Sequence, residues 1–499
     1  MQFAGQRTDM DLKPVGEPVN LMVKLGDDVL PSPYAILTTG ITPQMTQADG
    51  LTEAELARYL CKEIFAEDTV AVGYNNVRFD DEFMRYLFWR SFHDPYEWAW
   101  KDGRSRWDML DVVRMTRALR PDGIKWPVDK DGKATNRLEL ITKANKIGHE
   151  KAHDAMSDVE ALMDVARLLR EKQGKLFDYL FAMRNKKEVQ KLVNLDEKKE
   201  FVYVSGRYET EYEKATVAFP LTSGRNGNVV VYDLRYSPEK LAGMGKKELK
   251  EFLFERWSYS HDAFSKSSTQ SEQSAQGDIS MLDKSSGDSV ATAASSELRA
   301  RMVNDFKKGH ESSLPRSVIK ELKYGHCPAV APVGVLEQEN GWEKIGLTME
   351  QVQKNKKELL AHPEFAELVR ELYEERPEFE NKGYAEARLY EGFLNDSDRV
   401  RVEAVRNADE KKLADFHPEF ADERLPELLL HYKGRNYPKS LSSDEMIAWE
   451  TWREEQVREQ LPGFAAEMEK LAGSADGAEK QYLLQELQLW CENIAPMDY

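Results

Sequence analysis

The spacing of hydrophobic positions divides the chain into three regions. In residues 1–172, short apolar runs alternate with stretches of helical spacing, which predicts an α/β domain. The run at 68–73 (DTVAVG) is apolar throughout and predicts a buried strand. The predicted elements are strands at 2–9, 19–24 and 68–73, and helices at 52–66, 80–92, 108–119 and 154–169. Each of the last three helices begins at an aspartate, which predicts an N-cap.

From about residue 199 the hydrophobic period becomes two. Strands are predicted at 201–205, 215–219 and 228–234, with the sequence SGRNG forming the turn between the last two. Residues 173–347 are therefore predicted to be a small β-rich domain. Between Ser265 and Ser296, 11 of 32 residues are serine and none is aromatic or proline, which predicts a disordered insertion.

Residues 348–499 are predicted to form a helical domain. Long stretches rich in Glu, Lys and Leu are interrupted by proline. The sequence HPEF occurs at 362–365 and again at 417–420. No fixed period connects the two copies, so we interpret them as two helix starts and not as a repeat architecture.

Composition narrows the class of protein. The chain of 499 residues has a mean hydropathy of −0.64 and no apolar run near 18 residues, which excludes a membrane-spanning protein. We expect no secretory signal, because no basic and then apolar leader opens the chain. Three distant cysteines form neither a disulfide framework nor a CxxC metal site, which favours the reducing cytoplasm. The net charge of −18 argues against indiscriminate coating of nucleic acid but allows a local basic groove.

Asp80 is the first candidate for chemistry. It follows the predicted strand that ends at Gly73, and ligands of α/β folds gather beyond the carboxyl ends of strands. The simpler interpretation is that Asp80 only caps a helix.

A second group lies at 152–158 (AHDAMSD). If Asp154 caps the helix, then Asp158 lies one turn later and His153 lies just ahead, so a carboxylate and an imidazole share a small volume. The carboxylate suits Mg²⁺, and the imidazole suits proton transfer near neutral pH. The simpler interpretation is a capped surface helix with a chance histidine.

The stretch 85–120 combines positive charge with aromatic residues. It carries eight Arg and Lys, five Asp and Glu, and eight aromatic residues. Aromatic faces stack on unpaired bases while cations follow the phosphates, so the stretch favours a single strand as ligand. We expect Phe88, Trp89 and Phe92 to lie in the core, and Tyr96, Trp98 and Trp100 to be available for stacking.

Several motifs together resemble the bacterial exodeoxyribonuclease I family of DEDD-h exonucleases. They are GYNNVRFDDEF (73–83), DPYEWAW (94–100), SRWDMLDVVR (105–114), RLELITKAN (137–145), AHDAMSD (152–158), HCPAVA (326–331), LYEGFLNDSDR (389–399) and HYKGRNYP (431–438). The resemblance covers nearly the whole chain outside the serine-rich insertion. It implies an RNase H-like exonuclease domain, an SH3-like β domain and a C-terminal helical domain that together close a groove around single-stranded DNA.

The resemblance also implies roles for individual residues. Asp80 and Asp158 match carboxylates of the metal site, which in the family holds two Mg²⁺ ions, and His153 matches the general base. Arg137 matches an arginine that contacts the substrate phosphate. The positions that match the path of the single strand are Arg85, Tyr96, Trp100 and Arg114.

One family motif has no counterpart in this sequence. The family carries an Asp-x-Glu on its first, central strand, whereas this chain starts at Met1-Gln2-Phe3, inside the strand that follows. We expect a start upstream of Met1 or a copy that has lost the motif, and the intact remaining motifs favour the first. Without this pair, Asp80 and Asp158 alone would hold metal poorly, and the sheet would lack a central strand.

The implied function is Mg²⁺-dependent 3′→5′ hydrolysis of single-stranded DNA to nucleoside 5′-monophosphates, in DNA repair and recombination. The implied partners are single-stranded DNA and the single-stranded DNA-binding protein, for a cytoplasmic monomer without membrane contact. One alternative is a catalytically dead module that only binds single-stranded DNA, because the Asp-x-Glu is absent. Another is a ribonuclease of the same class, although the length of the chain argues against it.

Overall fold

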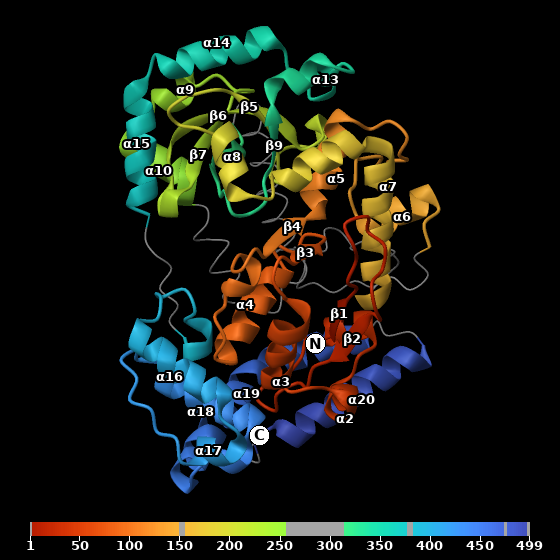
Figure 1. Cartoon of the computed structure of the whole chain (residues 1–499), viewed down its shortest axis with the longest axis vertical. Helices are drawn as coiled ribbons and strands as arrows, with labels where there is room; N and C mark the ends of the chain where they lie inside the picture. The colour runs from red at the N-terminus through yellow and green to blue at the C-terminus, as the bar shows by residue number, and fades with distance from the viewer. Residues whose placement is uncertain (1, 149–154, 256–313, 377–382, 474–476, 497–499) are drawn as a thin grey trace, which may run out of the picture.

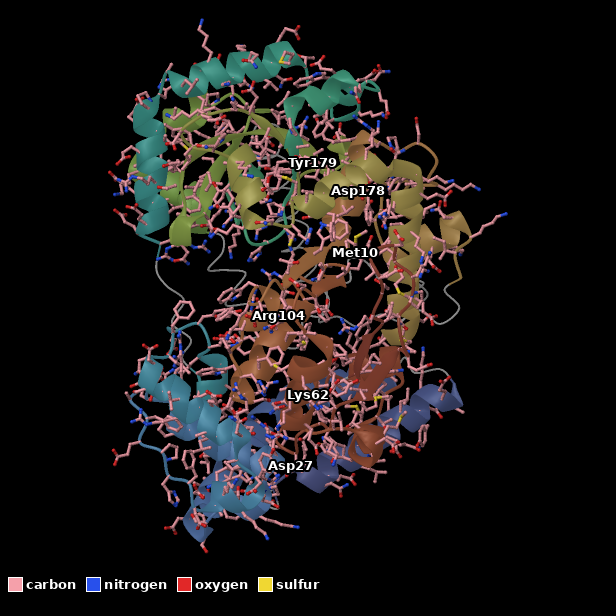
Figure 2. All side chains as sticks on the ribbon, viewed as in Figure 1. Met10, Asp27, Lys62, Arg104, Asp178 and Tyr179 are labelled. Carbon is pink, nitrogen blue, oxygen red and sulfur yellow. The ribbon has the colours of Figure 1, made fainter. Side chains whose placement is uncertain are left out.

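Three regions follow one another along the longest axis of the molecule in the computed structural model (Figure 1). The structure describes residues 2–148, 155–255, 314–376, 383–473 and 477–496. The N-terminal region lies in the middle, the β-rich region at one end and the C-terminal helices at the other. Side chains pack the interior of each region, and Asp27 marks the junction between the N-terminal region and the C-terminal helices (Figure 2).

The N-terminal region contains two separate two-stranded sheets. Strands β1 (Gln2–Gly5) and β2 (Val19–Met22) pair antiparallel, whereas β3 (Val70–Gly73) and β4 (Ser105–Asp108) pair in parallel. In the described residues no ladder joins the two sheets. The other elements here are α1 (Pro33–Thr39), α2 (Pro43–Asp49), α3 (Glu53–Tyr59), α4 (Asp80–Arg90), α5 (Met109–Leu119), α6 (Leu138–Asn145) and α7 (Ala155–Ala182).

Two predictions for this region are wrong in detail. Strand β3 is not buried, because Val72 keeps 43% of its surface exposed beside a large cavity. Asp80 is not an N-cap but the first residue of α4, whose cap position is Phe79 and carries no side-chain hydrogen bond. Asp108 does cap α5, as predicted, because its side chain accepts a hydrogen bond from the backbone of Leu110.

The β-rich region contains a five-stranded antiparallel sheet in the order β8-β7-β6-β5-β9. Its strands are β5 (Phe201–Val204), β6 (Ala215–Ser223), β7 (Val229–Asp233), β8 (Ile319–Leu322) and β9 (Ala329–Pro332). The predicted turn between β6 and β7 is confirmed. Helices α14 (Met349–Leu360) and α15 (Pro363–Glu374) wrap this sheet rather than joining the C-terminal helices (Figure 1). The serine-rich insertion lies outside the described residues.

The C-terminal region is helical, as predicted. Its longer helices are α16 (Asp396–Asn407), α18 (Arg424–Asn436), α19 (Ser443–Ala472) and α20 (Ala478–Ile494). The first HPEF begins α15 at Pro363, but the second begins no helix. Its failure has a local cause: the buried Asp398 accepts hydrogen bonds from the backbone of Ala421 and Asp422, which holds the chain after this motif in a turn.

The two ends of the sequence pack against each other. Helix α1 contacts α19 and α20, and Figure 1 shows α20 running beside α2. The Leu30 amide donates to Gln460 Oε1 at 2.8 Å, and Trp490 Nε1 donates to the Val29 carbonyl at 3.0 Å. None of the described helices is long and apolar enough to cross a lipid bilayer.

Candidate functional site

A cavity of about 2520 Å³ lies between the two small sheets of the N-terminal region. It is lined by β1, by β3 and the loop after it, and by the first turns of α7. Four of the residues predicted for the site line this cavity: Asp80, Arg114, Arg137 and Asp158. The cavity therefore brings together two acidic and two basic groups that lie far apart in the sequence.

Asp80 lies at the start of α4, where the residue is exposed and lines the cavity. The protein atoms around its carboxyl raise its pKa, and a hydrogen bond to its own backbone acts in the opposite direction. A carboxylate that faces a cavity suits a metal ligand, because a bound cation would stabilise its charged form. Asp158 lies in the first turn of α7 and faces the same cavity. His153 and Asp154 lie outside the described residues.

The two arginines already have acidic neighbours. Arg114 pairs with Asp111 at 2.6 Å, while its buried Nε has no hydrogen-bond partner. Arg137 stands at the N-cap position of α6 and forms an ion pair with Glu139. The Arg137 pair is partly exposed and contributes little energy, so its guanidinium group can exchange a carboxylate for a phosphate. The Arg114 pair is more buried.

One of the three aromatic residues predicted to be available for stacking, Trp98, is buried. Trp100 is 65% exposed, whereas Trp98 is only 5% exposed and packs on Phe65 with 5.1 Å between ring centroids. The stacking role predicted for Trp98 is therefore wrong. Phe88, Trp89 and Phe92 are buried, as predicted.

A second region contributes to the same aromatic surface. Tyr96 lies 6.0 Å from Phe393 of the C-terminal region, which is 83% exposed. The guanidinium group of Arg85 lies 5.8 Å from the Tyr96 ring centroid. It also forms an ion pair with Glu82 and donates a hydrogen bond to the Tyr390 hydroxyl. The half-buried ring of Tyr96 and the exposed ring of Phe393 thus lie close to each other and come from two regions.

Sequence reasoning missed the role of Asp108 beyond its cap. Its carboxylate accepts hydrogen bonds from the backbone of Asn75 at 2.8 Å and of Val77 at 3.3 Å. Burial, with some repulsion from Asp111, raises the pKa of Asp108 to about 6. Asp108 thereby holds the loop that leads to Asp80. The only signal in the sequence is its place at the end of β4, opposite Gly73 of β3.

Among the described residues, no group of three metal-ligating side chains lies in the cavity. In the part of the chain that the structure describes, the one group of three His, Cys, Asp or Glu with ligand atoms all within 4.8 Å of one another is Glu386, Glu427 and His431. This group belongs to the C-terminal region and was not foreseen from the sequence. Asp80 and Asp158 are thus not joined by a third ligand among the described residues.

Comparison with known proteins gives the same domains along the whole chain. Residues 1–166 match the model of an exonuclease family, residues 184–266 and 284–375 match the exonuclease I SH3-like domain, and residues 384–494 match the exonuclease I C-terminal domain. The chain is 35% identical to exodeoxyribonuclease I of Haemophilus influenzae over 97% of this chain and 93% of that protein.

Solved structures agree with these matches. A crystal structure of E. coli exonuclease I in complex with a dA16 oligonucleotide superposes with a TM-score of 0.84 at 33% identity, covering 99% of this chain and 95% of that one. A crystal structure of SSB/exonuclease I in complex with an inhibitor superposes with a TM-score of 0.81 at 32% identity, over the same shares of the two chains.

Proposed function

The chain belongs to the exodeoxyribonuclease I family, and from this membership we propose that it removes nucleotides from the 3′ end of single-stranded DNA. The products would be nucleoside 5′-monophosphates, and the cellular setting would be DNA repair and recombination in the cytoplasm. The observation that carries the proposal is the shared cavity, which is lined by Asp80, Asp158, Arg114 and Arg137.

Asp80 and Asp158 are the residues proposed to hold Mg²⁺. Carboxylate oxygens suit this hard ion, and the room in the cavity leaves space for substrate phosphate beside it. When bound there, Mg²⁺ would supply Lewis-acid activation of the phosphodiester and of the attacking water. The missing third ligand among the described residues predicts weak metal binding by this pair alone.

The remaining residues have separate tasks in this proposal. His153 accepts the proton of the attacking water. Arg137 neutralises the phosphate next to the scissile bond, and Arg114 contacts a phosphate farther along the strand. Tyr96 and Trp100 stack on unpaired bases. The Arg85 guanidinium group packs on the Tyr96 ring and holds it in place.

A second function, binding of single-stranded DNA without cleavage, is favoured by one specific observation. No third acidic or histidine ligand joins Asp80 and Asp158 among the described residues, whereas the aromatic surface around Tyr96 and Phe393 is present. Binding by stacking and phosphate contacts needs no metal, so the chain can bind single-stranded DNA even if it does not hydrolyse it.

A single pair of assays separates the two functions. Binding of a labelled single strand is measured in Ca²⁺, and single-turnover cleavage is measured in Mg²⁺, for the chain of residues 1–499. Cleavage that falls by about 10²–10⁴-fold in His153→Ala, with unchanged binding, supports the exonuclease. Asp158→Asn should abolish Mg²⁺-dependent cleavage, whereas the matched control Asp164→Asn, farther along the same helix, should not.

Binding without any cleavage by the parent chain would favour the second function. Cleavage at the parental rate in both His153→Ala and Asp158→Asn would remove the proposed roles of these residues.

We also propose that the chain works as a monomer with the single-stranded DNA-binding protein as its partner. The support is the superposition on a structure of SSB/exonuclease I. Size-exclusion chromatography with and without that partner tests both statements, since each predicts a distinct elution volume.

A further inference from the structure

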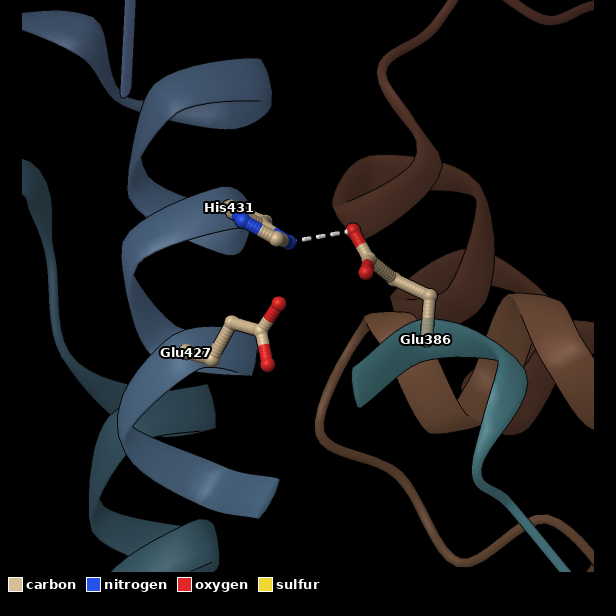
Figure 3. A group of neighbouring side chains, drawn as sticks. All are labelled: Glu386, Glu427 and His431. Atoms are coloured by element: carbon tan, nitrogen blue, oxygen red, sulfur yellow. Dashed lines mark hydrogen bonds and ion pairs between the residues drawn. The ribbon is translucent and has the colours of Figure 1, made fainter. Parts of the chain in front are cut away.

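Two glutamates and a histidine face one another at the start of the C-terminal region. Glu386 comes from the single turn η8 (Ala385–Ala387), whereas Glu427 and His431 lie four residues apart on one face of α18. Figure 3 shows the two carboxylates and the imidazole turned toward a common space. Their ligand atoms all lie within 4.8 Å of one another.

Hydrogen bonding leaves part of this group unsatisfied. His431 is 1% exposed and contacts Glu386 Oε1 through Nδ1 at 2.6 Å. The second oxygen of Glu386, Oε2, is buried without a hydrogen-bond partner. No ion pair of Glu427 is found among the described residues. A buried carboxylate oxygen without a donor is costly, so its orientation toward Glu427 and His431 requires an explanation.

Arginines reach only part of this group. Glu386 contacts Arg435 at 2.9 Å, Arg435 contacts Asp28 at 2.7 Å, and Arg90 contacts Glu53 at 2.5 Å. Arg435 is therefore shared between Glu386 and Asp28, and the Oε2 atom of Glu386 is left without a hydrogen-bond partner.

We propose that Glu386, Glu427 and His431 bind one divalent transition-metal ion of the Zn²⁺ type. A divalent ion would give the unpartnered Glu386 oxygen and the Glu427 carboxylate a common partner. Zn²⁺ binds both imidazole nitrogen and carboxylate oxygen, and water can take the fourth position beside three protein ligands. The imidazole nitrogen makes the site unsuitable for Mg²⁺, which prefers oxygen ligands.

Metal binding here would join two regions of the molecule. The indole Nε1 of Trp89 in α4 donates to the Ala385 carbonyl at 2.9 Å, and Arg435 of α18 holds Asp28 of the N-terminal region. An ion between η8 and α18 would fix both of these contacts. The site is separate from the cavity that holds Asp80 and Asp158, so its role is to stabilise the junction and not to cleave DNA.

The test is a titration of the chelator-treated full chain with Zn²⁺, repeated with Co²⁺, whose visible absorption reports nitrogen and oxygen ligation. We expect one tight equivalent for the parent and a higher thermal midpoint with metal. Glu427→Gln should weaken this equivalent by at least about 10-fold. The matched control is Glu423→Gln, one turn earlier on the chain, where the side chain is 80% exposed and pairs with Arg388. It should bind like the parent.

A further variant distinguishes metal binding at this site from metal binding in the cavity of the N-terminal region. Asp158→Asn should retain the equivalent and the Co²⁺ spectrum, because it lies in the other site. Retention of the equivalent by Glu427→Gln would overturn the proposal. Failure of Zn²⁺ to bind the parent would also overturn it. If Glu427→Gln then raised the thermal midpoint without metal, the two glutamates would simply repel each other in the parent.

Discussion

The five-stranded sheet of the SH3-like domain and the two small sheets of the exonuclease domain contain similar residues but differ in burial. Every residue of β5 and β7 is buried, whereas no residue of β1 or β3 is. Helices and neighbouring strands cover the five-stranded sheet on its edges and faces. In the exonuclease domain, β1 and β3 instead line the same cavity. The apolar sequence VAVG of β3 therefore allows this strand to be buried, but the elements packed around a strand determine how much of it is buried.

The largest expected effect comes from filling the cavity between the two small sheets with an added strand. We expect an apolar strand carrying Asp-x-Glu, added ahead of Gln2, to raise single-turnover cleavage by about 10³-fold. The added carboxylates would complete the metal site of Asp80 and Asp158, which is worth several kcal/mol in the transition state.

The control for that experiment is the same strand with Asn-x-Gln. It should fill the gap and raise the thermal midpoint without raising the rate. Equal rates for the two strands would show that the cavity needs packing and not charge.

Trp98 and Trp100, two tryptophans of the exonuclease domain, sharpen the contrast between buried and exposed surfaces. Trp100→Ala should weaken binding of single-stranded DNA by about 1–3 kcal/mol through lost stacking, without loss of stability. Trp98→Ala should instead destabilise the domain by about 3 kcal/mol, because it empties a site next to Phe65. Binding in Ca²⁺ and urea unfolding measure the two effects, and Trp100→Phe, which keeps an aromatic face, is the control. Parental binding by Trp100→Ala would exclude the stacking role.

A pair of valines tests the same contrast in the sheets themselves. Val231→Ala in β7 should cost about 1.5–2 kcal/mol of unfolding free energy, because two buried methyl groups are lost. Val72→Ala in β3 should cost less than about 0.5 kcal/mol, because the side chain is already largely in water. Urea unfolding provides both numbers. Similar losses at the two positions would mean that the cavity is closed in solution.

The buried carboxyl of Asp108 extends the comparison to pH dependence. Its folded pKa of about 6 lies above the unfolded value of about 3.9, so the folded state binds more protons between these values. Stability contributed by Asp108 is therefore lost as the pH rises from about 4 to 6, by at most about 3 kcal/mol.

Asp108→Asn should remove this slope. Asp233, whose pKa burial also raises to about 6, is unchanged in both chains, so the difference between the two curves isolates Asp108. An unchanged slope would assign the pH dependence to other groups.

The fold could be predicted from the sequence where the local pattern and the tertiary neighbours agree. The strands of the SH3-like sheet alternate clearly, and the turn before β7 has the glycine and asparagine that such turns require. The alternation of Tyr96, Trp98 and Trp100 misled, because Glu97–Ala99 is a 3₁₀ turn and Trp98 points inward. The second HPEF misled because Asp398, 19 residues before it, holds the segment after it in a turn.

The candidate site was only partly predictable. Asp80 and Asp158 came from motifs, and the structure places both on one cavity. Asp108 was missed because its importance lies in backbone groups of another loop, which no spacing along the chain reveals. Glu427 and His431 are four residues apart on α18, but Glu386 lies on a different segment, so only the fold unites the three.

The contact of α1 with the last two helices governs when this protein can fold. Leu30 and Gln460 are 430 positions apart in the sequence. At about 5–20 residues per second, a ribosome needs about 20–90 s to make the intervening chain. During this time the apolar side of α1 has no partner from α19 or α20 and is open to chaperones and to aggregation. Chain length adds little to the free energy of joining the two segments, so the delay is a matter of synthesis time. Helices α19 and α20 thus complete the packing of a segment that was made several hundred residues earlier.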